Sequence, residues 1–216
     1  MSERSARLRA KNGIKSTNQF DCYVIFYLEG SCLPQQPPTF IPEVIEYSAI
    51  LINSRNCLKE EEFHAYCRPR IYPILSEYCQ ETTGVVQAVV DKASDFATVH
   101  HLFLNWLCNA TSNRNNFSMV TSSCKGTIEL FLTQCRREKV AIPLWIEHWI
   151  DLPIIFRKCY GYHRFPTISD MLHKFQIAYE GRFLHGFQRA ENLAAILCGM
   201  LQDGCCIKCD TDHHVI

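Results

Sequence analysis

Tyr27 and Glu29 stand at the end of an apolar run, "CYVIFYLEG", that is typical of a buried strand over residues 22–29. Side chains two residues apart in a strand point to the same face of the sheet. Two carboxylates placed in this way can bind metal ions. Here the first of the two positions carries a phenol instead. The sequence therefore raises the question of whether this strand end is a metal-dependent active site or the remains of one.

The composition favours one globular domain and gives no general attraction to polyanions. The chain has 216 residues, of which 47% are hydrophobic, and its 22 basic residues balance its 22 acidic residues. Local basic patches can still exist on such a chain. No apolar run approaches the ~18 residues of a membrane span, so we expect no membrane association. No secretory signal core is visible at the N-terminus.

Thirteen cysteines at irregular spacing are expected to be reduced thiols, which suits a cytoplasmic or nuclear protein. We expect residues 1–19 to form a basic, disordered tail, with an arm that touches RNA as the alternative. The C-terminal tail, residues 206–216, follows the end of the domain. The Cys and His residues near this end resemble no zinc module in their spacing, so we expect no metal there, although the ligand types would suit zinc: Cys205, Cys206, Cys209, His213 and His214.

The order of predicted elements indicates a mixed α/β domain with one central sheet. Strands are predicted at 22–29, 44–53 and 62–69, and a shorter one at 117–123. Helical periodicity predicts helices at 95–110, 126–139 and 189–204, and Gly204 is a natural helix stop.

Several spaced motifs resemble the Eri/Snipper-type 3′→5′ exoribonucleases, a family of DEDDh enzymes. The motifs that match this family in order and spacing are Arg68-Pro69, Leu75-Ser76-Glu77-Tyr78-Cys79, Thr83-Gly84-Val85-Val86-Gln87 and "MLQDGC" at 200–205. The resemblance covers residues 20–205, which we take as an exonuclease-like domain. It implies a ribonuclease H-like exonuclease fold, with a central mixed sheet of about five strands flanked by helices.

The resemblance also implies a chemistry. In this family four carboxylates hold two Mg²⁺ or Mn²⁺ ions about 3.5–4 Å apart, and a histidine acts as the general base. At the matching positions this chain retains one acid, Glu29, whereas the other positions carry Tyr27, Gly126, Leu184 and Arg189. One acid remains and the base is missing, so we expect no metal cofactor.

Neighbouring residues do not restore the missing carboxylates or the missing histidine. His185 lies one residue beyond the family histidine, Glu129 lies one helical turn after position 126, and Glu191 belongs to another helix face. Asp21 is roughly 20 Å back along the first strand. A buried Glu29 needs a partner, and Arg189 is the candidate for an ion pair with it.

We therefore expect a catalytically inactive exonuclease domain that binds RNA 3′ ends or serves as a protein-interaction module. The alternative is an active metal-dependent 3′→5′ exoribonuclease with a non-standard site. Candidate RNA contacts are Lys125, Arg189 and Arg68, since guanidinium and ammonium groups bind phosphate. The near-zero net charge slightly favours protein partners over RNA.

Overall fold

A computed structural model describes residues 19–113, 116–122, 124–178 and 186–208, without the side chains of residues 124 and 125. Residues 1–18 of the N-terminal tail that we predicted at 1–19, and residues 209–216 of the C-terminal tail predicted at 206–216, lie outside these ranges. No helix in the described ranges is long and apolar enough to cross a membrane.

The described residues form one mixed sheet of five strands in the order β3-β2-β1-β4-β5. β1 pairs antiparallel with β2 and parallel with β4, and the outer pairs are antiparallel β2–β3 and parallel β4–β5. The strands are β1 (Cys22–Gly30), β2 (Val44–Asn53), β3 (Lys59–Tyr66), β4 (Phe117–Thr121) and β5 (Trp149–Asp151). The prediction of a mixed α/β sheet of about five strands is confirmed.

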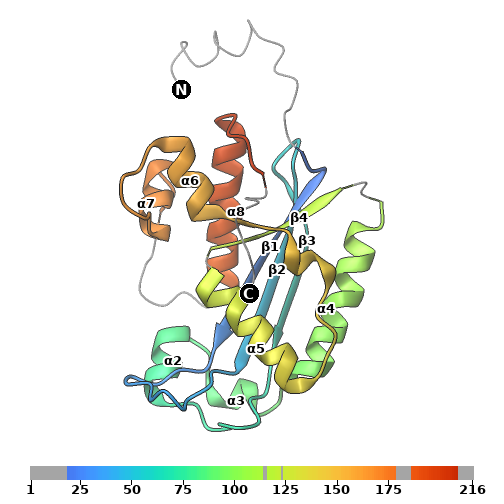
Figure 1. Cartoon of the computed structure of the whole chain (residues 1–216), viewed down its shortest axis with the longest axis vertical. Coiled ribbons are helices and arrows are strands. Elements are labelled where there is room, and N and C mark those ends of the chain that lie inside the picture. The colour runs from blue at the N-terminus through green and yellow to red at the C-terminus, as the bar shows by residue number, and fades with distance from the viewer. Residues whose placement is uncertain (1–18, 114–115, 123, 179–185, 209–216) are drawn as a thin grey trace, which may run out of the picture.

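Helices cover both faces of this sheet (Figure 1). α4 and α5 pack on one face, and α6, α7 and α8 pack on the other. The α-helices of the described residues are α2 (Glu77–Thr83), α3 (Gln87–Val90), α4 (Phe96–Thr111), α5 (Glu129–Glu138), α6 (Leu152–Tyr160), α7 (Ile168–Lys174) and α8 (Gly186–Gln202).

The strand β1 is apolar throughout because both of its faces are buried. Val24 and Phe26 belong to the core under α4 and α5, whereas Tyr23 and Ile25 belong to the core under α8. Continuing this alternation, Tyr27 also packs against the α8 side. The same face at the next position carries Glu29, so the strand itself directs both residues toward α8.

Several element boundaries differ from the predictions. β4 ends at Thr121, two residues before the predicted end at 123. β3 covers 59–66 rather than 62–69, because the chain leaves the sheet there and the N–H of Arg68 donates to the carbonyl of Ser94. The helix predicted at 126–139 begins with a π-helical turn, Cys124–Ile128, before α5. α8 begins at Gly186, three residues before the predicted start. β5, which has three residues, is too short to produce a periodic signal in the sequence.

Candidate functional site

A pocket of about 410 Å³ opens at the C-terminal end of β1. Its lining combines the end of β1, the segment after it and the start of α5. The described lining residues are Tyr27, Leu28, Glu29, Gly30, Ser31, Cys32, Gln36, Pro42, Gly126, Glu129, Leu130 and Thr133. Three positions that the family resemblance singled out, 27, 29 and 126, therefore meet at one cavity.

Arg189, in the first turn of α8, reaches across to the two β1 residues. Its Nη1 lies 2.9 Å from Oε1 of Glu29 and donates a hydrogen bond of 3.0 Å to the hydroxyl of Tyr27. Its Nη2 donates to the carbonyl of Thr82, at the end of α2, at 3.2 Å. The side chain of Glu29 is 9% exposed and that of Arg189 is 29% exposed. The predicted ion pair between Glu29 and Arg189 is confirmed.

This ion pair does not fully compensate the burial of Glu29. Burial raises the pKa of Glu29 to about 7, although the positive charge of Arg189 acts in the opposite direction and Glu46 adds a further increase. Burial, followed by the charge of Glu29, raises the pKa of Tyr27 to about 12. Near neutral pH, Glu29 is therefore divided between its protonated and ionised forms, whereas Tyr27 stays a neutral phenol.

Glu46 is a second buried acid beside Glu29, and the sequence analysis did not identify it. It lies directly opposite Glu29 in the β1–β2 register and its side chain is fully buried. Its carboxylate accepts the N–H groups of Gly186 and Phe187 at 2.9 and 3.2 Å, and Oε1 lies 2.7 Å from Nε2 of His64. An acid at the positive end of α8 stabilises the helix and fixes where it begins.

The close approach of α8 to the two acids requires a glycine at its first residue. A Cβ at position 186 would lie 2.8 Å from Oε2 of Glu46 and 2.9 Å from Cγ of Glu29. Because Gly186 lies so close to both acids, Arg189, one helical turn later, lies over the end of β1. A lone acid inside the apolar segment "VIEYSAILIN" was the available signal for Glu46, because a buried charge must have partners.

The other predicted site residues are placed as follows. Glu129 lines the pocket with Gly126, whereas Arg68 is exposed and does not line it. Leu184 and His185 lie outside the described residues, as does the side chain of Lys125. Away from the pocket, Glu191 lies 3.6 Å from Lys59, and Asp21 lies 3.8 Å from Arg55.

The described donor set does not fit a two-metal centre. Hard dications such as Mg²⁺ require several anionic oxygen ligands around one point. Among the described residues, no group of three or more His, Cys, Asp or Glu side chains is arranged to hold a metal ion. The guanidinium of Arg189 lies 2.9 Å from Glu29, the one retained family acid, which lines the pocket. The absence of a metal cofactor stays a prediction.

The sheet order, the helices on both faces and the pocket at the end of β1 define an exonuclease-type α/β domain. The chain belongs to the Exonuclease (RNase_T) family, whose model matches residues 34–187. It is 33% identical to the 3′-5′ exonuclease Snipper of Drosophila melanogaster over 196 residues, which are 82% of this chain and 68% of that protein. It is 28% identical to human 3′-5′ exoribonuclease 1 over 214 residues, 96% of this chain and 60% of that protein.

Solved structures confirm the fold. The nuclease domain of 3′hExo, a DEDDh family member bound to rAMP, superposes with a TM-score of 0.83 at 28% identity, over 89% of this chain and 97% of that one. The 3′-exonuclease whose structure concerns 3′-end specific recognition of histone mRNA stem-loop superposes with a TM-score of 0.81, also at 28% identity, over 88% and 86%. In the sequence comparisons, the chain spans about 60% of the length of the exoribonuclease 1 relatives.

Proposed function

We propose that this domain binds the 3′ end of single-stranded RNA in the pocket at the end of β1 and does not cleave it. One observation carries the proposal: a guanidinium lies 2.9 Å from the retained family acid and 3.0 Å from the Tyr27 hydroxyl. A fixed cation there opposes the binding of dications. The same cation suits a phosphate, because guanidinium and phosphate form strong charge-assisted hydrogen bonds.

The pocket and the relatives support an RNA end as the ligand. A volume of about 410 Å³ falls within the usual range for small-molecule sites. A related nuclease domain binds rAMP, and a related 3′-exonuclease recognises the 3′ end of a histone mRNA stem-loop. In this chain Arg189 would hold a phosphate near the 3′ terminus, and the half-buried apolar side chain of Leu130 would contact the terminal nucleoside.

The experiment measures binding and cleavage of the same RNA. A 12-nucleotide single-stranded RNA with a 5′ fluorophore is titrated with the protein, with and without Mg²⁺ or Mn²⁺, and then resolved on a denaturing gel. We expect binding, no shortened product, and about tenfold weaker binding by Arg189→Ala. Gln188→Ala, at the exposed preceding position of α8, is the matched control and should bind like the parent. Metal-dependent shortening that Glu29→Gln abolishes would establish the active exoribonuclease instead.

A protein-interaction module is the second candidate. Large apolar side chains are exposed on the segment after β3 and on α2, including Ile71 at 51%, Ile74 at 76% and Tyr78 at 43%. Exposed apolar side chains that gather in this way can mark a protein-binding surface. Absence of RNA binding by the parent at low salt would favour this function.

A further inference from the structure

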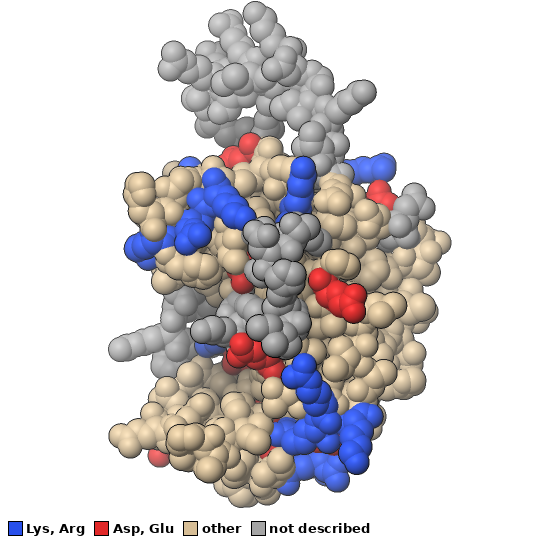
Figure 2. Space-filling view, viewed as in Figure 1, with Lys and Arg blue, Asp and Glu red and all other residues tan. Residues whose placement is uncertain are grey.

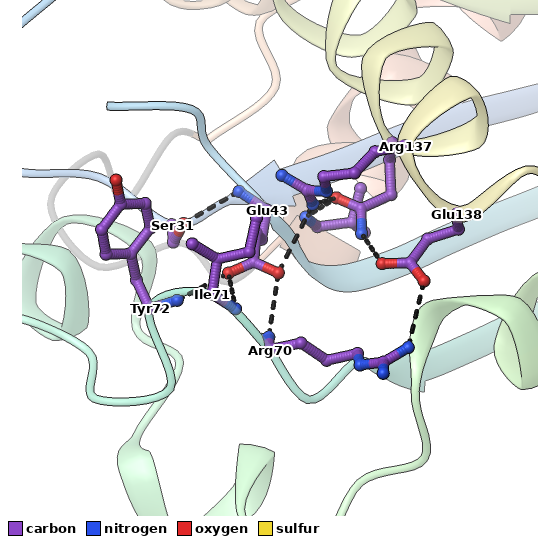
Figure 3. A network of polar contacts seen from close by, with 9 residues as sticks. Ser31, Glu43, Arg70, Ile71, Tyr72, Arg137 and Glu138 are labelled. Carbon is purple, nitrogen blue, oxygen red and sulfur yellow. Dashed lines mark hydrogen bonds and ion pairs between the residues drawn. The ribbon is translucent and has the colours of Figure 1, made fainter. Parts of the chain in front are cut away.

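Glu43 organises a second polar centre next to the pocket (Figure 3). Its side chain is 1% exposed, and its carboxylate accepts the backbone N–H groups of Arg70, Ile71 and Tyr72, each at 2.9 Å. Nη2 of Arg137, on α5, lies 3.4 Å from the same carboxylate. One buried acid thus ties the segment after β3 to the last turn of α5.

The exposed arms of this centre are cationic. Arg70, whose side chain is 63% exposed, lies 3.3 Å from Glu138 of α5 through its guanidinium. Arg68, Arg136 and Lys139 are exposed, and they form no ion pair in the part of the chain that the structure describes. We call Arg68, Arg70, Arg136, Arg137 and Lys139 the basic surface. Figure 2 shows Lys and Arg side chains gathered over the C-terminal end of α5 on this face.

The α5 residues of the basic surface lie close to the pocket along the helix. Glu129, Leu130 and Thr133 of α5 line the pocket, and Arg136 and Arg137 follow Thr133 by three and four residues, on the same side of the helix. This spacing is roughly 5 Å along the helix axis. Pro42, another lining residue, immediately precedes Glu43. A strand that leaves the pocket along α5 would therefore reach the basic surface within one or two nucleotides.

Helix stabilisation alone does not account for these cations. Arg136 and Arg137 in the last turn of α5 complement the negative end of the helix dipole, as Arg157 and Lys158 do in α6. Arg68 and Arg70, however, come from the segment after β3, which is not part of the α5 helix. Glu43 and the Ser94 carbonyl fix the backbone of that segment, and the guanidinium of Arg70 reaches Glu138 at the end of α5.

We infer that the basic surface binds the phosphates of the RNA segment that precedes the 3′-terminal nucleotide in the pocket. The inference rests on the proposed function for the entry of the 3′ end, and it adds the path of the strand. Rigid arginines suit this role because phosphate contacts set the position of a bound strand without reading its sequence. RNA too short to leave the pocket would not touch the basic surface.

The test compares two RNA lengths and two sets of charge changes. A 3-nucleotide and a 12-nucleotide single-stranded RNA of mixed sequence, each with a 5′ fluorophore, are titrated at several salt concentrations. The surface variant combines Arg68→Gln, Arg136→Gln and Lys139→Gln. The control variant removes the same charge far from the pocket, with Arg55→Gln, Arg157→Gln and Lys158→Gln, which all lie on exposed positions. Circular dichroism melting checks that both variants fold.

We expect the surface variant to bind the 12-nucleotide RNA about tenfold more weakly than the parent and the 3-nucleotide RNA equally well. Its log–log salt slope for the longer RNA should fall in magnitude by about 2, because each phosphate contact on a single strand contributes about 0.7. The control variant should match the parent on both lengths.

Three results would overturn the inference or separate it from the proposed function. Unchanged binding of the longer RNA by the surface variant, with weaker binding by Arg189→Ala, overturns the inference alone. Equal losses of affinity for the longer RNA in the surface and control variants also overturn the inference, since the effect would then come from the net charge of the protein and not from this surface. A loss in the surface variant with no effect of Arg189→Ala supports the basic surface and overturns the 3′-end pocket.

Discussion

Arg189 and Glu29 form an ion pair with a nitrogen–oxygen distance of 2.9 Å, between the first turn of α8 and the end of β1. The pair exists because α8 is fixed at its first residues by Glu46 and because β1 directs Glu29 toward that helix. The pKa of Glu29 is nevertheless raised to about 7, chiefly by burial. The attraction to Arg189 therefore stabilises the ionised Glu29 carboxylate by less than desolvation destabilises it, as is common for buried ion pairs.

A double-mutant cycle of Glu29→Gln and Arg189→Met should give a coupling of about 1–2 kcal/mol in urea unfolding at pH 8. The value is below that of a fully buried pair because the Arg189 side chain is 29% exposed. The pair Lys59–Glu191, at 3.6 Å and with side chains 46% and 47% exposed, is the control and should show coupling near zero. A coupling of zero at Glu29–Arg189 as well would mean that this contact adds no stability.

The contribution of Glu29 to stability should fall as the pH rises. Its pKa is about 7 in the folded protein against 4.5 ordinarily, so the folded state favours the protonated form. The stabilisation is full below pH 4.5 and is lost as the pH passes 7. Relative to Glu29→Gln, the free energy of unfolding of the parent should decrease by up to about 3 kcal/mol between pH 5 and pH 8. Denaturation series of both proteins measure this; parallel profiles would contradict it.

RNA binding should share this pH dependence. Protonation of Glu29 removes the negative charge that lies 2.9 Å from Arg189, so the parent should bind the 12-nucleotide RNA several-fold more tightly at pH 6 than at pH 8. In Glu29→Gln the two affinities should be nearly equal. Anisotropy titrations at constant ionic strength make the comparison, and an equal pH effect in both proteins would assign it to other groups.

Glu43→Gln should destabilise the domain by about 2–4 kcal/mol. The amide keeps one acceptor oxygen and loses the charge, so backbone N–H groups of the 70–72 segment and the Arg137 guanidinium are left poorly compensated. Glu138→Gln, which affects the more exposed contact with Arg70, should cost less than about 1 kcal/mol. Thermal and urea unfolding compare the two, and similar costs would refute a central role for Glu43.

Restoring the family residues should create metal binding. The variant carries Tyr27→Asp, Gly126→Asp, Leu184→His and Arg189→Asp and keeps Glu29. We expect Mn²⁺ to raise its melting temperature, because ligands that bind only the folded state stabilise it, and we expect Mn²⁺-dependent shortening of RNA. The same variant with Glu29→Gln is the control. If Mn²⁺ neither raised the melting temperature of the restored variant nor promoted RNA shortening, the pocket would differ from the family site in more than its metal ligands.

The sequence by itself determined the fold class and part of the site. The apolar run of β1, the helical stripes and the spaced motifs predicted a mixed α/β exonuclease domain with Tyr27 and Glu29 at the first strand end, and the structure and the relatives confirm it. The Glu29–Arg189 pair was also predicted, because a buried acid needs a partner. β5 was not located, because three residues give no measurable period.

Only the tertiary structure decided which other buried acids position the elements around the pocket. Glu46 and Glu43 both lie in or beside one apolar strand and look alike in sequence. Glu46 meets the N-terminus of α8, 140 residues away along the chain, whereas Glu43 holds the 70–72 segment and meets Arg137 of α5, 94 residues away. Strand pleating fixes which face a side chain takes, and it is a local property. Which helix end covers that face depends on how the whole chain packs, and no local pattern encodes it.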